Sequence, residues 1–255
     1  MERGRGHLAK QSAWRDRVRV AYLDEPPFFV PSADSGTPTG CDIELIQHVL
    51  DGLGVLSVEF VLTTFSDLIP GVREGRWTIN VPMFVTEARA ELVDFSRPVW
   101  VAGDGFIVRD ADAETWTSYE AIADDSSATL AVVVAQIQEQ TALQAGVPPE
   151  RIISFPDQQI AAEAVRAGQA DAFASTAPGN RAYVDRAADR TLSFVSDTPS
   201  TSRSGLPVGA FSFAKSTPHL TDAVNSSLDR YLGTKQHLEM MSRYGFTRQD
   251  LAPVL

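Results

Sequence analysis

The chain has few of the residues that mark metal sites and disulfide frameworks. Its 255 residues include a single cysteine, Cys41, so it can form neither an internal disulfide nor a zinc site built on cysteines. The histidines are scattered without metal-ligand spacing, and no apolar run is long enough to span a bilayer. We therefore expect no bound metal, no cofactor and no transmembrane helix.

Basic residues are also scarce. Lysine and arginine total 22 against 33 aspartates and glutamates, which gives a formal net charge of −11. An acidic surface of this kind repels nucleic acid and anionic lipid, so neither is an expected partner. Hydrophobic residues make up 44% of the chain, which is typical of a globular protein with a sizeable core.

The N-terminal segment has no export signal. Its basic residues, in MERGRGHLAKQSAWRDR, are not followed by an apolar stretch and a small-residue cleavage site. We expect residues 1–16 to form a flexible arm. Two locations fit this segment. The protein is either periplasmic or extracellular, with its leader missing from this sequence, or it is cytoplasmic.

Common enzyme motifs are missing as well. The chain contains no G-x-x-x-x-G-K-[ST], no G-x-S-x-G and no H-E-x-x-H, and no G-x-G-x-x-G follows a strand. No nucleophile beside a base stands out. We therefore expect a protein that binds a molecule without converting it.

What the chain does contain is two series of strands that alternate with helices. The first series has expected strands at 18–23, 58–65 and 77–85. The second has expected strands at 128–136, 151–156 and 170–176. Asp42 is expected to cap the first helix, and the apolar residues of 221–246 fall on one helical face. Such alternation is typical of parallel sheets, and its restart indicates two α/β lobes.

The most informative segment is PMFVTEARAELVDFSRPVW, residues 82–100. A strand ends there, and Thr86 is placed to cap a short helix that carries Arg89. A cation in the first turn of a helix is unfavourable unless it faces an anion. Because the guanidinium fork holds a carboxylate through two parallel hydrogen bonds, Arg89 is either a solvated arginine or a carboxylate clamp.

This segment resembles the diagnostic stretch of the family 3 bacterial extracellular solute-binding proteins, the polar amino-acid receptors of ABC importers. The family pattern is T-x-x-R followed by v-d-F-S-x-P, and the chain has Thr86, Arg89, the run from Val93 to Ser96, and Pro98. Further similar stretches include VRVAYLDEPPF, TGCDIELIQHVLDGLG, FSDLIPGVREGRW and AAEAVRAGQADAFAST. Together they cover about residues 17 to 250.

The resemblance implies an α/β fold of the two-lobed, type II periplasmic-binding-protein kind. Lobe 1 would comprise residues 17–105 and 210–255, and lobe 2 residues 106–209, joined by two crossover strands. The lobes would close by a hinge motion on a ligand whose carboxylate Arg89 holds. The expected protein is a monomer that delivers a small zwitterion to the permease subunits of an ABC transporter.

Two positions depart from the pattern of family members that bind α-amino acids. Those members usually hold the ligand ammonium with an Asp where this chain has Thr176, and Phe84 replaces a small or hydroxylated residue. Glu25, Phe28 and Phe65 would join Phe84 in an aromatic box with one carboxylate. Such a box suits a delocalised cation. The spacing is similar to that of the ectoine- and hydroxyectoine-binding branch, so we expect an ectoine-like compatible solute or a modified amino acid.

Several residues remain open to two interpretations. Phe29 is assigned to packing. Phe65 fits either packing or the pocket, and Glu25 fits either a solvated loop position or the pocket. On the second lobe, Ser175 at the end of a strand is a preferred contact. Gln136 and Gln138 lie where a helix begins, and the sequence leaves open which of them faces the cleft. Backbone amides there could donate to a carboxylate.

Other functions also remain open. The first is a receptor for a polar α-amino acid. The second is an enzyme of the cyclohexadienyl-dehydratase type on the same fold, for which Glu25 is the only nearby acid. The third is a cytoplasmic or sensor-linked ligand domain, which would explain why the sequence has no leader.

Overall fold

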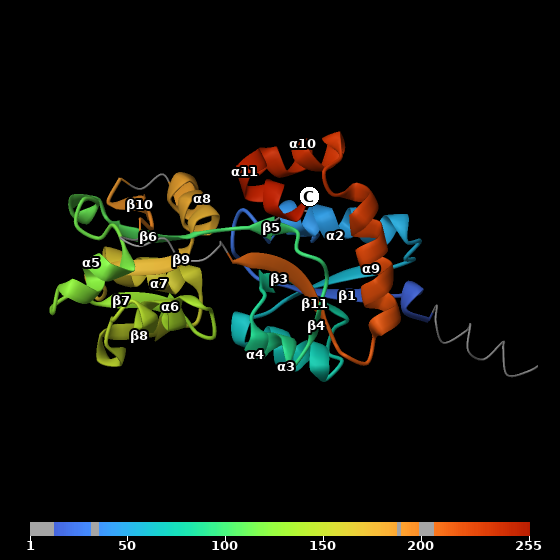
Figure 1. Cartoon of the computed structure of the whole chain (residues 1–255), viewed down its shortest axis with the longest axis horizontal. Helices are drawn as coiled ribbons and strands as arrows, with labels where there is room; N and C mark the ends of the chain where they lie inside the picture. The colour runs from blue at the N-terminus through green and yellow to red at the C-terminus, as the bar shows by residue number, and fades with distance from the viewer. Residues whose placement is uncertain (1–12, 32–35, 188–189, 199–206) are drawn as a thin grey trace, which may run out of the picture.

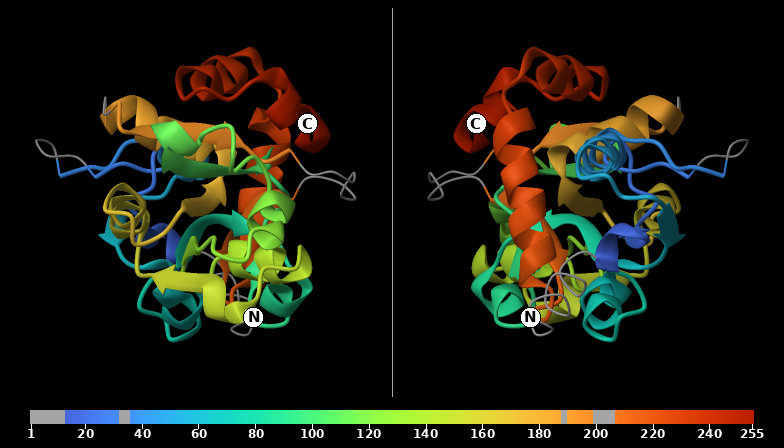
Figure 2. Two further views of the ribbon diagram at one scale, coloured as in Figure 1. Left: turned by 90° about the vertical axis from the view of Figure 1, so that its left-hand side faces the viewer. Right: turned by 90° about the vertical axis from the view of Figure 1, so that its right-hand side faces the viewer.

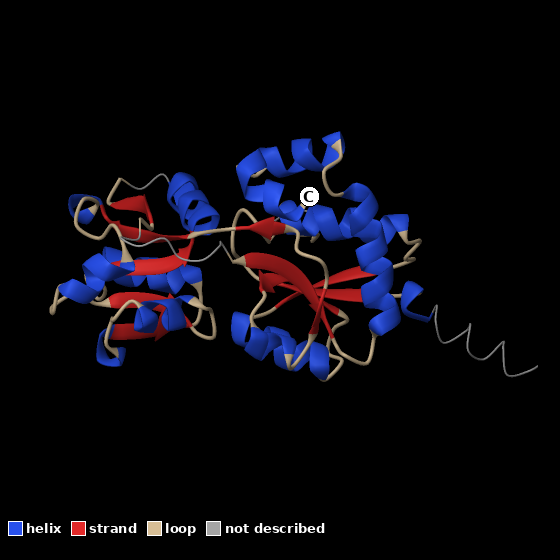
Figure 3. Ribbon diagram, viewed as in Figure 1, coloured by secondary structure: helices blue, strands red, loops and turns tan. Residues whose placement is uncertain are grey.

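The computed structural model describes residues 13–31, 36–187, 190–198 and 207–255. They form two bodies that lie side by side, each built around its own sheet (Figure 1). Helices pack against the faces of both sheets (Figure 3). Within these described ranges, no helix is long and apolar enough to cross a membrane.

The larger body contains a sheet in the order β2-β1-β3-β11-β4, with β5 also paired to β11. Its strands are β1 (Val18–Tyr22), β2 (Val58–Leu62), β3 (Ile79–Phe84), β4 (Asp94–Phe95), β5 (Trp100–Val101) and β11 (Val208–Phe213). Its helices are α2 (Cys41–Gly52), α3 (Leu68–Arg73), α4 (Glu87–Ala90), α9 (Pro218–Tyr231), α10 (Lys235–Arg243) and α11 (Arg248–Leu251). The apolar residues of β1 are buried on both faces, as in a central parallel strand.

The smaller body contains a sheet in the order β10-β6-β9-β7-β8. Its strands are β6 (Asp104–Arg109), β7 (Leu130–Val133), β8 (Ile152–Phe155), β9 (Ala172–Thr176) and β10 (Leu192–Ser196). Its helices are α5 (Tyr119–Asp124), α6 (Gln138–Gln144), α7 (Gln158–Arg166) and α8 (Ala177–Ala187). Alternate strand residues build two separate cores, because Phe106 faces α5 and α6 while Ile107 faces α7 and α8.

The expected parallel pairing is confirmed among the six predicted strands, but each sheet also contains antiparallel strands that the sequence did not predict. β1 pairs in parallel with β2 and β3, and β7 with β8 and β9, but β11 is antiparallel to β3 and β6 is antiparallel to β9. β6 and β11 are the strands through which the chain passes into each sheet from the other body, and each runs antiparallel to a strand of the parallel set in its sheet. β6 begins at Asp104 and β11 at Val208. The expected division of the lobes at 105/106 and 209/210 stays a prediction.

The tail does not form the single amphipathic helix that the spacing predicts. α9 ends at Tyr231 and α10 begins at Lys235, with Gly233 between them at φ 80°. A positive φ is accessible to glycine and ends the helix there. α10 then leaves the line of α9 and lies across the top of the molecule in both views of Figure 2.

Two further expectations concern the ends of elements. Asp42 does not cap α2, because the N-cap is Gly40 and Asp42 lies within the first turn with its side chain buried. Of the expected N-terminal arm, residues 1–12 lie outside the described residues, while Ala13–Arg15 form a short 3-10 helix. Trp14 in that helix packs on the core of the larger body.

Candidate functional site

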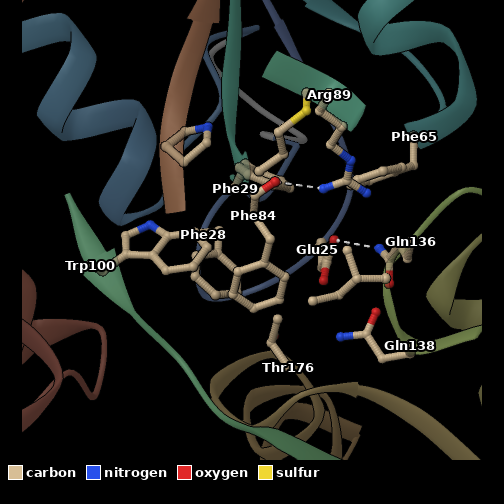
Figure 4. Close-up of a pocket in the computed structure, with 13 residues that line it drawn as sticks. Glu25, Phe28, Phe29, Phe65, Phe84, Arg89, Trp100, Gln136, Gln138 and Thr176 are labelled. Carbon is tan, nitrogen blue, oxygen red and sulfur yellow. Dashed lines mark hydrogen bonds between the residues drawn. The ribbon is translucent and has the colours of Figure 1, made fainter. Parts of the chain in front are cut away.

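A pocket lies between the two bodies, where strands of both sheets end (Figure 4). It holds about 360 Å³ of space not occupied by atoms, part of which opens to solvent. The pocket is lined by Glu25, Phe28, Phe29, Phe65, Pro82, Met83, Phe84, Arg89, Trp100, Gln136, Ile137, Gln138 and Thr176.

Arg89 reaches the pocket from the short helix α4. β3 ends at Phe84, and the Thr86 side chain caps α4 by accepting a hydrogen bond from the Arg89 amide at 3.2 Å. The guanidinium donates from Nη1 to the Phe84 carbonyl and from Nη2 to the Ala135 carbonyl, both at 2.8 Å. Its carbon lies 5.1 Å from the centre of the Phe65 ring. Arg89 therefore spans from the larger body to the smaller one with its plane held on both sides.

The charge of Arg89 has no anionic partner in the described residues. The side chain is 9% exposed, and burial lowers the pKa of Arg89 to about 10, so it is still a cation at neutral pH. A buried cation without a counterion is costly. The two carbonyls leave further N–H groups of the fork unused, and a carboxylate is the group that fits them.

Glu25 lies on the loop after β1, in a tight turn held by backbone hydrogen bonds. The Glu25 carbonyl accepts from the amides of Phe28 and Phe29 at 3.1 and 3.2 Å. The carboxylate is 8% exposed, and its contacts are long: Gln136 Nε2 donates at 3.4 Å and the Ser175 hydroxyl at 3.5 Å.

Burial governs the protonation of Glu25. It raises the pKa of Glu25 from 4.5 to about 7, and the contacts from Ser175 and Gln136 oppose this only in part. At neutral pH the carboxyl is therefore about half ionised. A cation in the pocket would favour the ionised form.

Aromatic rings form the wall beside Glu25. The Trp100 ring centre lies 5.0 Å from that of Phe28 and 5.5 Å from that of Phe84, with an 80° angle between the Trp100 and Phe84 planes. Strand register explains the arrangement, because Gly209 of β11 pairs with Trp100 of β5 on one side and with Phe84 of β3 on the other. A side chain at Gly209 would collide with the Trp100 ring, with a Cβ only 2.3 Å away.

The smaller body contributes polar groups to the opposite side. The Gln138 side chain is 1% exposed and donates to Asp104 at 2.7 Å. The Thr176 hydroxyl accepts from the Gly179 amide at 3.2 Å in the first turn of α8. Both are oriented by their own partners before a ligand arrives.

The structure brings seven of the eight predicted site residues to this pocket. The lining includes Arg89, Phe84, Glu25, Phe28, Phe65, Thr176 and Gln136. Ser175 does not line it but touches Glu25 through its hydroxyl. Their contacts with a ligand stay a prediction.

The sequence did not identify every lining residue. Phe29, assigned to packing, is 2% exposed within the core and also lines the pocket. Trp100 was not identified, although it ends the informative segment 82–100. Gln138 was considered together with Gln136, but the sequence could not say which of the two faces the cleft; both line the pocket.

Comparison with known proteins gives one family. The sequence model of the "Bacterial extracellular solute-binding proteins, family 3" matches residues 18–247. The chain is 27% identical over 245 residues to a probable amino-acid ABC transporter periplasmic-binding protein, y4tE of Sinorhizobium fredii (strain NBRC 101917 / NGR234). That match covers 94% of this chain and 80% of the relative.

Solved structures share the fold. The crystal structure of EhuB in complex with hydroxyectoine superposes with a TM-score of 0.87 at 23% identity, over 96% of this chain and 95% of that one. The ancestral amino-acid-binding protein AncCDT-1, a precursor of cyclohexadienyl dehydratase, gives a TM-score of 0.77 at 27% identity, over 93% and 98%.

Proposed function

Because the chain belongs to the family 3 bacterial extracellular solute-binding proteins, with the two-sheet α/β fold of type II periplasmic binding proteins, we propose that it captures a small zwitterion between its two bodies. The observation that carries the proposal is one pocket with a buried arginine and a separate buried glutamate, neither of which has an oppositely charged partner among the described residues. A molecule with one carboxylate and one cationic group supplies both missing partners.

The cationic half of the ligand is proposed to be delocalised or shielded by carbon. Its surroundings are the rings of Phe28, Phe84 and Trp100, with a single carboxylate at Glu25. Aromatic faces attract such cations by about 0.5–2 kcal/mol per contact. Compact ammonium ions are more strongly hydrated and gain less from a wall of this kind. An ectoine-like solute, which joins an amidinium to a carboxylate, meets both requirements.

Isothermal titration calorimetry tests the proposal directly. The panel is ectoine, hydroxyectoine, glycine betaine and polar amino acids, each titrated into the wild type and Arg89→Ala. We expect one of the first three to bind most tightly and Arg89→Ala to lose that binding. Arg76→Ala is the matched control, because Arg76 also lies over an aromatic ring, Trp77 at 4.8 Å, but outside the pocket. Equal affinities in the wild type and Arg89→Ala would sink the site assignment.

We place the protein in an importer as its external receptor. The family's name describes extracellular proteins, and the relative y4tE carries the description of a periplasmic-binding protein of an ABC transporter. In this proposal the closed form with its ligand docks on the permease subunits as a monomer. Fractionation of cells that express the whole gene, with the ligand's uptake measured in a deletion strain, tests location and transport together.

A polar α-amino acid is the second candidate ligand. The Glu25 carboxylate supports it, because a compact ammonium could pair with this group even though Thr176 is neutral. AncCDT-1, at 27% identity, is described as an amino-acid-binding protein. Tighter binding of arginine or glutamine than of ectoine in the same calorimetric panel would favour this ligand class.

A third candidate is a dehydratase on the same fold. A carboxyl whose pKa is about 7 can act as a general acid near neutral pH, and Glu25 has this property inside the pocket. Incubation with prephenate or arogenate, followed by detection of the aromatic product, tests it. Product formed by the wild type but not by Glu25→Gln would establish the enzyme.

A further inference from the structure

Asp42 lies behind the aromatic wall and is completely buried. Its side chain is 0% exposed, and its Oδ1 accepts a hydrogen bond from Trp100 Nε1 at 3.0 Å. The Cys41 thiol points to the same oxygen at 3.7 Å, while Oδ2 has no partner among the described residues. Asp42 does not line the pocket, so the proposed function gives it no direct contact with a ligand.

The indole of Trp100 depends on this carboxyl for its orientation. The ring lies flat over Gly209, where any side chain would collide with it, and Phe28 and Phe84 contact it in the pocket wall (Figure 4). These contacts are apolar and do not fix which edge of the ring faces inward. The indole N–H is the ring's single polar group, and when buried it needs an acceptor. Asp42 is that acceptor.

Asp42 also holds the loop that carries Phe28. The Asp42 amide donates to the Phe28 carbonyl at 3.1 Å, and the Cys41 amide donates to the Pro27 carbonyl at 3.1 Å. These amides belong to the first turn of α2, where they have no partner within the helix. One residue therefore sets two rings of the pocket, Trp100 through its side chain and Phe28 through its backbone.

We propose that Asp42 is a positioning residue that fixes the Trp100 and Phe28 rings in the geometry that receives the cationic group of the ligand. This inference rests on the proposed function, because it presumes that the pocket binds a cation. A carboxyl is an expensive group to bury, and an apolar residue would pack here at lower cost if filling space were its only role. Burial raises the pKa of Asp42 well above its usual range, which favours the neutral carboxyl.

Two substitutions separate positioning from packing. Asp42→Asn keeps a neutral acceptor for the indole, so it should bind the ligand as the wild type does. Asp42→Leu has similar volume and leaves the indole N–H without an acceptor. We expect it to raise the Kd about tenfold, since an unpartnered buried donor costs on the order of that factor. In a Trp100→Phe background the same change should have no further effect on Kd, because no indole N–H remains.

Asn80→Leu is the matched control. Asn80 of β3 is also 0% exposed, and its side-chain oxygen accepts from the buried indole of Trp77 at 2.5 Å. Neither residue lines the pocket. Asn80→Leu should lower the melting temperature and leave the Kd unchanged. If Asp42→Leu changed only the melting temperature, as Asn80→Leu does, the inference would be wrong.

A readout without ligand keeps this test apart from the proposed function. The indole ¹H–¹⁵N signal of Trp100 is assigned by its absence in Trp100→Phe. We expect slow hydrogen exchange of that signal in the wild type and Asp42→Asn, and fast exchange in Asp42→Leu. If no ligand of the panel binds, the proposed function fails, while the exchange data still decide whether Asp42 holds the ring. Slow exchange in Asp42→Leu would overturn the inference.

Discussion

The protonation of Glu25 should make ligand affinity depend on pH. Burial raises the pKa of Glu25 to about 7, and a cationic group prefers the ionised carboxylate. At pH 8 the carboxyl of the free protein is about 90% ionised, and at pH 6 about 10%. The Kd for a zwitterion should therefore rise about tenfold from pH 8 to pH 6, because most of the protein must first release a proton.

The stability of the ligand-free protein should change in the opposite direction. The folded pKa of Glu25 lies above the ordinary value of 4.5, so the folded state holds its proton more tightly than the unfolded chain. The Glu25 contribution to stability is thus fully favourable below pH 4.5 and is lost as the pH rises through 7, by about 3 kcal/mol in total. Glu25→Gln should be more stable than the wild type at pH 8 by up to that amount, and the difference should vanish at about pH 4, below the unfolded pKa.

Calorimetry at pH 6, 7 and 8 checks the binding prediction, with a ligand that has no titrating group in this range. Two buffers of different ionisation enthalpy report the proton released on binding below pH 7. Glu25→Gln serves as the control and should bind weakly with no pH slope. A wild-type Kd that stays flat between pH 6 and 8, or a slope that survives in Glu25→Gln, would refute the reasoning.

Three further predictions concern the same pocket. Phe84→Leu keeps an apolar side chain but removes a π face, so the Kd for a betaine-like cation should rise about fivefold. An unchanged Kd by calorimetry would mean that the ring supplies only volume. Thr176→Asp can still accept from the Gly179 amide and adds a carboxylate, so the ratio of Kd values should shift about tenfold towards α-amino acids; a constant ratio would contradict this. A plain monocarboxylate should bind more tightly as the pH falls from 8 to 6, the reverse of a zwitterion, because it prefers neutral Glu25; matching slopes in a competition assay would exclude the charge assignment.

Local patterns were enough to predict six of the eleven strands that the structure describes, together with the principal charged groups of the pocket. The alternation in VRVAYL predicts β1, and Thr86 followed by Arg89 predicts the cap and the guanidinium of α4, because these features depend on a few neighbouring residues. The family resemblance added the expectation of a ligand cleft between two lobes, and the family model confirms the resemblance. Phe28 and Phe84 could be chosen because they were expected at the carboxyl ends of strands, the edge where α/β proteins bind ligands, whereas Glu25 stayed open between the pocket and a solvated loop.

Contacts between distant segments were beyond such patterns. Asp42 looks like an N-cap in the sequence, but the loop crosses so close to Gly40 that a Cβ there would lie 2.2 Å from the Phe28 carbonyl oxygen. Gly40 is therefore the N-cap of α2, and the Asp42 side chain points inward to Trp100. Trp100 itself reaches the pocket only through its register with Gly209, more than a hundred residues away. No local signal contains that pairing.

The two buried charges of the pocket are not equivalent, and their difference decides what the site requires. Glu25, with a pKa of about 7, can take up a proton near neutral pH when no cation is present. Arg89, with a pKa of about 10, remains charged at neutral pH in the same circumstances and has no anion beside it. A ligand without a carboxylate therefore leaves an uncompensated buried cation, whereas a ligand without a cation leaves only a neutral acid. In the proposed function, the ligand's carboxylate should therefore be the obligatory half of recognition, and the cationic half should be the one to which Glu25 and the aromatic wall can adjust.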